Sequence, residues 1–152
     1  MQTREDILGD GYGYIPRPTD QRVNFSLFFQ DYLPGNPTWK MHLAAFYGSR
    51  LPTGPPNSEP WQMVFRMPPY RRIDIGLSKS LITNKLGNRR MAAGFISDLW
   101  FSAEVFNLFG FNNQASYQWV RTVSNQEGIP NMFAVPNYLT GRLLNLRLTV
   151  KF

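Results

Sequence analysis

The chain has 152 residues, of which 43% are hydrophobic, 15% aromatic and 17% charged, and it has no cysteine. The sequence has no long apolar run, so we expect no helix that spans a bilayer, and the missing cysteine excludes a disulfide framework and a thiolate metal site. The net charge of +6 comes from basic residues scattered singly or in pairs, such as Arg71-Arg72, which argues against a nucleic-acid partner. This aromatic-rich, charge-poor composition fits either a transmembrane β-barrel or a soluble β-sandwich.

Two strands joined by a short turn are predicted first. From Arg22 to Leu33, Val23, Phe25, Leu27 and Phe29 alternate with Asn24, Ser26, Phe28 and Gln30, and a period of two indicates a strand with two unlike faces. Residues 34–37, Pro-Gly-Asn-Pro, predict a compact turn. The second strand is predicted from Thr38 to Arg50, with Met41, Leu43, Ala45 and Tyr47 on one face.

The middle of the chain predicts two further strands between loops. Residues 51–69 are rich in proline and predict a long irregular loop. The third strand is predicted from Tyr70 to Ile82, and residues 83–97 form a connection. The fourth strand begins near Asp98, and its alternation breaks at residues 106–110, which predicts a bulge or bend. Extended structure is expected to resume from Gln114 to Val123.

The chain ends in the clearest strand of the sequence. Residues 123–137 carry Gly128, Pro130 and Pro136 and predict another loop. From Gly141 to Phe152, the apolar residues Leu144, Leu146, Leu148, Val150 and Phe152 alternate with Asn145, Arg147, Thr149 and Lys151. We therefore expect a strand with one apolar and one polar face.

These elements predict an all-β fold, an antiparallel transmembrane β-barrel. The smallest single-chain bacterial barrels have about eight strands, so we expect this chain to supply a C-terminal segment of about five strands of a larger barrel. Residues 1–20 would end an extracellular loop, and residues 21–152 would form the C-terminal part of the barrel domain. Counting back from a periplasmic C-terminus puts residues 51–69 and 124–138 outside, as long outer loops and short periplasmic turns require.

The last strand resembles the C-terminal assembly signal of outer-membrane proteins, which the barrel-assembly machinery reads. The signal would comprise Leu146, Leu148, Val150 and the terminal aromatic Phe152. The alternative is an edge strand of a soluble sheet, although such an edge normally needs protection from pairing with other chains.

Several short motifs, in their order along the chain, resemble the last strands of a TonB-dependent receptor of the Bacteroidota type, the SusC-like or carboxypeptidase-regulatory-like-domain type. These motifs are Pro16-Arg17-Pro18-Thr19-Asp20-Gln21-Arg22, Tyr70-Arg71-Arg72-Ile73-Asp74-Ile75-Gly76, Glu104-Val105-Phe106-Asn107-Leu108-Phe109, Tyr138-Leu139-Thr140-Gly141-Arg142 and the terminal Phe152. The Asn-Leu-Phe element followed by a Gly-Arg entry into the last strand is the most diagnostic of them.

The resemblance implies a barrel of about 22 strands with a plug domain, which takes up a nutrient across the bacterial outer membrane in an energy-coupled reaction. The chain departs from this pattern because it contains no plug, no TonB-contacting segment and no early strands. We therefore expect its partners to be the remainder of the same barrel, the barrel-assembly machinery, outer-membrane lipid and, as a further candidate, a surface lipoprotein. Two other functions stay open: a non-transporting barrel component of a secretion or adhesion assembly, and a soluble carbohydrate-binding β-sandwich.

No catalytic set, metal site or cofactor is predicted, so we do not expect an enzyme. His42 is the single histidine and lies in the polar phase of its strand, where a structural role is favoured. Asp74 and Glu104 are isolated carboxylates that we expect to pair with basic residues on neighbouring strands: Arg72, Arg147 or Lys40.

Aromatic and basic residues in or beside the predicted outer loops are the candidates for contact with a ligand or a lipoprotein. They are Trp61, Tyr117, Trp119, Arg121 and Tyr138. A membrane-interface girdle or ordinary loop packing would explain the same residues, and we favour that interpretation.

Overall fold

The computed structural model describes residues 2–6, 9, 11–56, 59, 61, 65–83, 96–121, 132–139 and 141–152. All of its regular elements are strands, as the sequence predicts. Within these residues, no helix is sufficiently long and apolar to cross a membrane. The chain divides into two compact units: residues 1–25, 47–71 and 112–140 form the first, and residues 26–46, 72–111 and 141–152 form the second.

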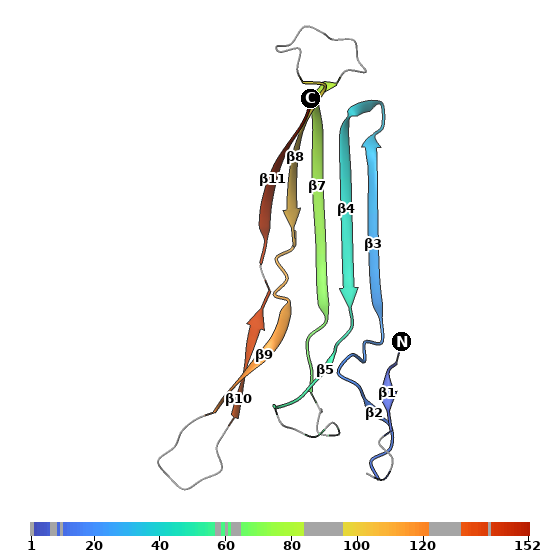
Figure 1. The fold of residues 1–152 in the computed structure, drawn as a ribbon, viewed down its shortest axis with the longest axis vertical. Helices are drawn as coiled ribbons and strands as arrows, with labels where there is room; N and C mark the ends of the chain where they lie inside the picture. Colours follow the sequence, from blue (N-terminus) through green and yellow to red (C-terminus); the bar gives the residue numbers. More distant parts are fainter. Residues whose placement is uncertain are drawn as a thin grey trace. The chain divides into compact units, whose positions relative to one another are not determined.

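The largest sheet has five strands in the order β11-β8-β7-β4-β3 (Figure 1). They are β3 (Asn24–Leu33), β4 (Asn36–Gly48), β7 (Tyr70–Thr83), β8 (Asp98–Phe106) and β11 (Leu143–Lys151). The strand β8 pairs antiparallel with both β7 and β11. This sheet forms because each of its strands alternates apolar and polar residues with a period of two.

Three two-stranded sheets complete the structure. They are β1 (Arg4–Glu5) with β2 (Ile15–Pro16), β5 (Pro52–Thr53) with β6 (Phe65–Arg66), and β9 (Gln114–Arg121) with β10 (Met132–Tyr138). All three are antiparallel.

The five predicted strands of the alternating segments are confirmed, with boundaries shifted by a few residues. The first turn is tighter than predicted, because β3 ends at Leu33 and β4 begins at Asn36. Gly35 has a φ of 73°, which a proline-glycine turn of this size requires and which glycine adopts without strain.

Two predictions about loops were wrong. Residues 132–138 lie in the segment predicted as a loop, yet they form β10 and pair residue by residue with β9. Their sequence lacks alternation and contains Pro136, which is tolerated because a two-stranded ribbon leaves one edge of each strand unpaired. Likewise, the proline-rich segment 51–69 is not wholly irregular, since β5 and β6 pair within it. Most of the predicted 83–97 connection, residues 84–95, lies outside the described residues.

One face of the five-stranded sheet is apolar. In the register of β11, β8 and β7, Leu146 stands opposite Ala103, which stands opposite Leu77. Residues directly opposite each other share a face. The same face carries Phe25 and Leu27 on β3, Phe101 on β8, and Leu144 and Leu148 on β11, and all of these side chains are exposed.

The opposite face carries polar side chains, together with the exposed aromatic residues Phe28, Tyr32 and Phe46. Asn145 stands opposite Glu104 and Arg147 opposite Ser102. Among the described residues, the only buried hydrophobic side chains are Ile15 and Ala44, whereas the buried polar and charged residues are Asp20, Asp74, Ser80, Ser102, Glu104, Asn107 and Asn113. The sheet therefore exposes its apolar face, whereas Asp74, Ser80, Ser102 and Glu104 on its other face are buried.

Candidate functional site: the polar face of the sheet

A charged cluster around Glu104 joins three strands of the polar face. Arg147 on β11 donates to Glu104 Oε1 over 2.6 Å, and Asn145 donates to Glu104 Oε2 over 3.1 Å. The Nε2 atom of His42 on β4 lies 3.9 Å from the same Oε1 atom. The predicted pairing of Glu104 with Arg147 is confirmed, and the buried carboxylate has three polar neighbours.

The imidazole of His42 lies over a glycine of the neighbouring strand. A Cβ atom at Gly76 of β7 would overlap the imidazole ring, so any side chain there would displace His42. On its other side, His42 stacks with Phe28 of β3 at a centroid distance of 6.3 Å. A packed structural position for His42 agrees with the prediction.

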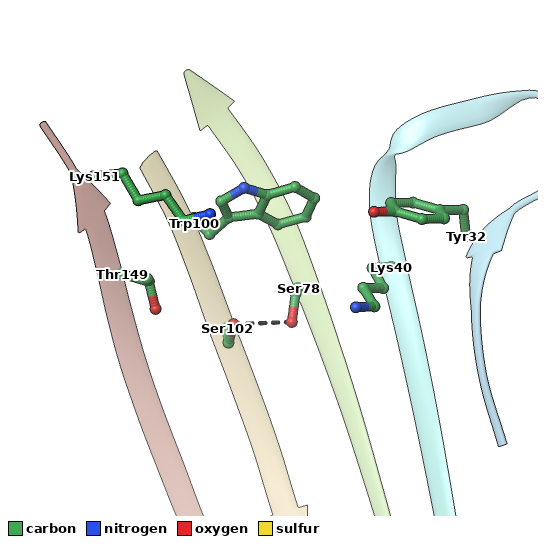
Figure 2. A pocket seen from close by; sticks show the side chains of 7 residues that line it. All are labelled: Tyr32, Lys40, Ser78, Trp100, Ser102, Thr149 and Lys151. Carbon is green, nitrogen blue, oxygen red and sulfur yellow. Dashed lines mark hydrogen bonds between the residues drawn. The ribbon is translucent and has the colours of Figure 1, made fainter. Parts of the chain in front are cut away.

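Next to this cluster, an open hollow of about 350 Å³ lies on the same face. Residues from all five strands line it: Tyr32, Lys40, Ser78, Trp100, Ser102, Thr149 and Lys151. The hydroxyl groups of Ser102 and Ser78 bind each other over 2.8 Å (Figure 2). Figure 2 shows Lys40 and Lys151 extending from opposite sides of the hollow, with the Trp100 indole between them.

Two of the motifs that carry the family resemblance meet at Asp74. Its Oδ1 atom accepts hydrogen bonds from Arg72 Nε and from the backbone N–H of Asn107, each over 2.8 Å. Asp74 therefore pairs with Arg72, one of the predicted partners, but within β7 and not across strands as predicted. The backbone of Asn107 has a φ of 52°, and its side chain donates to the Phe111 carbonyl over 2.9 Å and accepts from the Phe111 N–H over 3.0 Å. The predicted break at residues 106–110 is thus a turn that Asn107 closes and Asp74 anchors.

The side chain of Asn113 forms the two backbone hydrogen bonds that a neighbouring strand would otherwise form with one residue of β7. Its side-chain amide accepts from the Arg71 N–H over 2.9 Å and donates to the Arg71 carbonyl over 2.7 Å. An asparagine side chain carries the same donor and acceptor as a peptide group. The backbone of Arg71 is therefore satisfied through a side chain.

A separate cluster is centred on Asp20, which is almost fully buried. Asp20 accepts from Arg66 Nη2 and from the Thr3 N–H, each over 2.8 Å. The hydrogen bond from Arg66, followed by that from Thr3, lowers the pKa of Asp20 below its ordinary value of 3.8. Arg66 also donates to the Arg50 carbonyl over 3.1 Å, so this cluster connects β6 with three segments outside the strands.

The predicted contact residues do not form one site. Trp61 stacks on Tyr12 with ring centroids 4.5 Å apart. Tyr117, Trp119 and Arg121 are alternate residues of β9 and so share one face of the β9–β10 ribbon. Tyr138 ends β10 opposite Gln114, next to a shift in register.

Three residues of the predicted assembly signal, Leu146, Leu148 and Val150, lie on the apolar face. Leu146 and Leu148 are 59% and 61% exposed, and Phe152, beyond the end of β11, is 88% exposed. Val150 is half-buried and stands opposite Leu99. These positions are the ones that the alternation predicts.

Sequence reasoning did not identify the hollow. Lys40, Trp100 and Lys151 each occupy the polar phase of a strand, which the sequence does reveal. Their meeting depends on the register between strands that are far apart in the chain. A search for cationic and aromatic residues in the polar phase of the strands would have found them.

A scan against protein-family models, a search of curated proteins and a search of solved structures each found no match to this chain.

Proposed function

We propose that this chain is part of an outer-membrane β-barrel, with its apolar face against lipid and its polar face toward the lumen. The observation that carries the proposal is the inverted burial of the five-stranded sheet. A barrel exposes apolar residues to lipid and encloses polar ones, so a sheet with one apolar and one polar face fits the wall of a barrel.

The size of the apolar face supports this orientation. On β4, Trp39 and Tyr47 lie on the apolar face eight residues apart, which corresponds to about 26 Å along the strand. With the tilt of barrel strands, about 35–45°, that length gives a band of roughly 20 Å, against about 25 Å for known barrels. Lys79 lies with its Nζ 4.9 Å from the centre of the Trp39 ring, and a tryptophan beside a lysine suits a membrane–water interface.

We further propose that the barrel is a TonB-dependent transporter and that this chain supplies its C-terminal strands. The support is the ordered set of motifs and the contact between two of them, Asp74 with Asn107. A non-transporting barrel component would use the same inverted faces. A soluble carbohydrate-binding sandwich would need a second sheet over the exposed apolar face, which makes it the weaker alternative.

Tryptophan quenching by brominated lipids tests the orientation of the sheet. This chain has four tryptophans, and variants of the whole barrel that retain only Trp39 or only Trp100 report on opposite faces. In vesicles of dibrominated phosphatidylcholine, the Trp39 variant should be strongly quenched and the Trp100 variant should keep most of its emission. Equal quenching, or quenching of Trp100 alone, would refute the proposed barrel orientation.

Genetic removal of the TonB protein separates transport from the other barrel functions. Cells that lack the protein containing this chain and cells that lack TonB should share one nutrient-uptake defect, and removing both should add nothing to it. An additive defect, or no uptake defect in cells lacking this protein, would contradict the transport proposal and leave the barrel orientation unaffected.

A further inference from the structure

We propose that the hollow on the polar face binds a small, elongated dicarboxylate, with Lys40 holding one end and Lys151 the other. The inference stands on the chemistry of this hollow alone. It would hold for a barrel lumen and for any other setting of the sheet.

The two lysines supply the positive charge of the hollow. Neither has a carboxylate within 4.0 Å among the described residues, whereas Arg147 and Arg72 are both paired with carboxylates. Lys40 lies 5.8 Å from the centre of the Tyr32 ring, a contact that leaves its N–H donors available. Asp98 stands opposite Lys151 in register but forms no ion pair with it. The residues that line the hollow include no acidic side chain.

The spacing of the strands sets the length of the ligand. Lys40 is on β4 and Lys151 on β11, and β7 and β8 lie between those strands. Across the sheet, their backbones are therefore about 14 Å apart, at ~4.8 Å for each of the three strand spacings. Along the sheet, Lys151 lies four residues beyond Arg147, the residue opposite Ser102, which adds an offset of about 13 Å. Two lysines that extend inward from such distant strands suit two separate anionic groups better than one.

The centre of the hollow suits an uncharged middle. Ser78 and Ser102 are small, and their hydroxyl groups already bind each other. The Trp100 indole lies between the lysines (Figure 2) and offers an apolar surface. A short aliphatic chain with a carboxylate at each end therefore matches the hollow in charge, length and polarity.

Binding of adipate to the intact protein in neutral detergent, measured by titration calorimetry at low salt, tests this proposal. Hexanoate is the matched control, with the same chain length and one carboxylate. Adipate should bind more tightly than hexanoate, and rising salt should weaken its binding because the lysines are partly exposed to solvent. No adipate binding, or equal affinity for the two acids, would overturn the proposal.

Charge-removing variants locate the two ends. Lys40→Gln and Lys151→Gln should each weaken adipate binding about threefold to tenfold, the range for one partly exposed charged contact. Lys79→Gln, on the apolar face, is the matched control and should leave the affinity unchanged. If Lys79→Gln weakens binding as much as the other two variants, the attraction is a general effect of net charge and the proposed site is wrong. Lipid quenching of Trp39 is a separate measurement, so failure here and failure of the barrel proposal are distinguishable.

Discussion

Replacing Asp74 by alanine removes the acceptor that two hydrogen bonds share. The bond from the Asn107 N–H is buried and charge-assisted, and its loss should cost about 1.5–3 kcal/mol. The ion pair with Arg72 contributes less, about 0.5–1 kcal/mol, because the Arg72 side chain is 35% exposed. Asp74→Ala should therefore lower the free energy of unfolding by about 2–4 kcal/mol.

Urea unfolding in lipid vesicles, followed by tryptophan fluorescence, measures this loss. Asp74→Asn is the control, because an amide oxygen still accepts from the Asn107 N–H while the charge is gone. It should cost only about 1 kcal/mol. If the alanine and asparagine variants unfold at the same urea concentration, the buried bond to Asn107 does not stabilise the protein and the reasoning fails.

Three further predictions concern a turn, a close contact and a buried carboxylate. Asn107→Ala should be less stable to urea than Asn107→Gly by about 1 kcal/mol, because both variants lose the side-chain hydrogen bonds but only alanine is strained at positive φ. Equal stabilities would show that backbone strain at this position does not matter. Gly76→Ala should lower the free energy of unfolding by about 1–3 kcal/mol, because the added methyl group displaces the His42 imidazole. Adding His42→Ala to this variant should restore most of the lost stability, and a double variant as unstable as Gly76→Ala alone would contradict the contact. The lowered pKa of Asp20 means that its ionised form stabilises the fold above pH 3.8, and this stability should be lost as the pH falls through the lowered folded-state pKa. The urea concentration at half-unfolding, measured between pH 5 and 2, reports this loss of stability. In Arg66→Gln the loss should shift toward pH 3.8, and a pH dependence equal to that of the unmodified protein would argue against the pairing of Arg66 with Asp20.

The strands of the five-stranded sheet were predictable because apolar and polar residues alternate within each of them. From Leu144 to Lys151 in β11, apolar and polar residues alternate without interruption, and a shift of one residue in register would reverse the two faces. The strand β10 has no such signal, since Pro136 interrupts a short apolar run, and only its pairing with β9 defines it. Long-range pairing outweighs local sequence in a segment of this kind.

The polar face was predictable in part. The pairing of Glu104 with Arg147 follows from two opposite charges in the polar phase of neighbouring strands. The anchoring of Asn107 by Asp74 was not predicted, because the acceptor and the turn lie on different strands and the donor is a backbone N–H. The hollow between Lys40 and Lys151 required the order of all five strands, which no local pattern contains.

The side chain of Asn113 has a consequence for amide hydrogen exchange at Arg71. In a strand ladder, an amide hydrogen is released to solvent when two strands separate, which requires a cooperative opening. At Arg71 the acceptor is a side-chain oxygen, so rotation of a single residue can release the hydrogen. The Arg71 amide should then exchange by a local route that urea hardly accelerates, while the amides of β7 that pair with β8 follow the opening of the sheet.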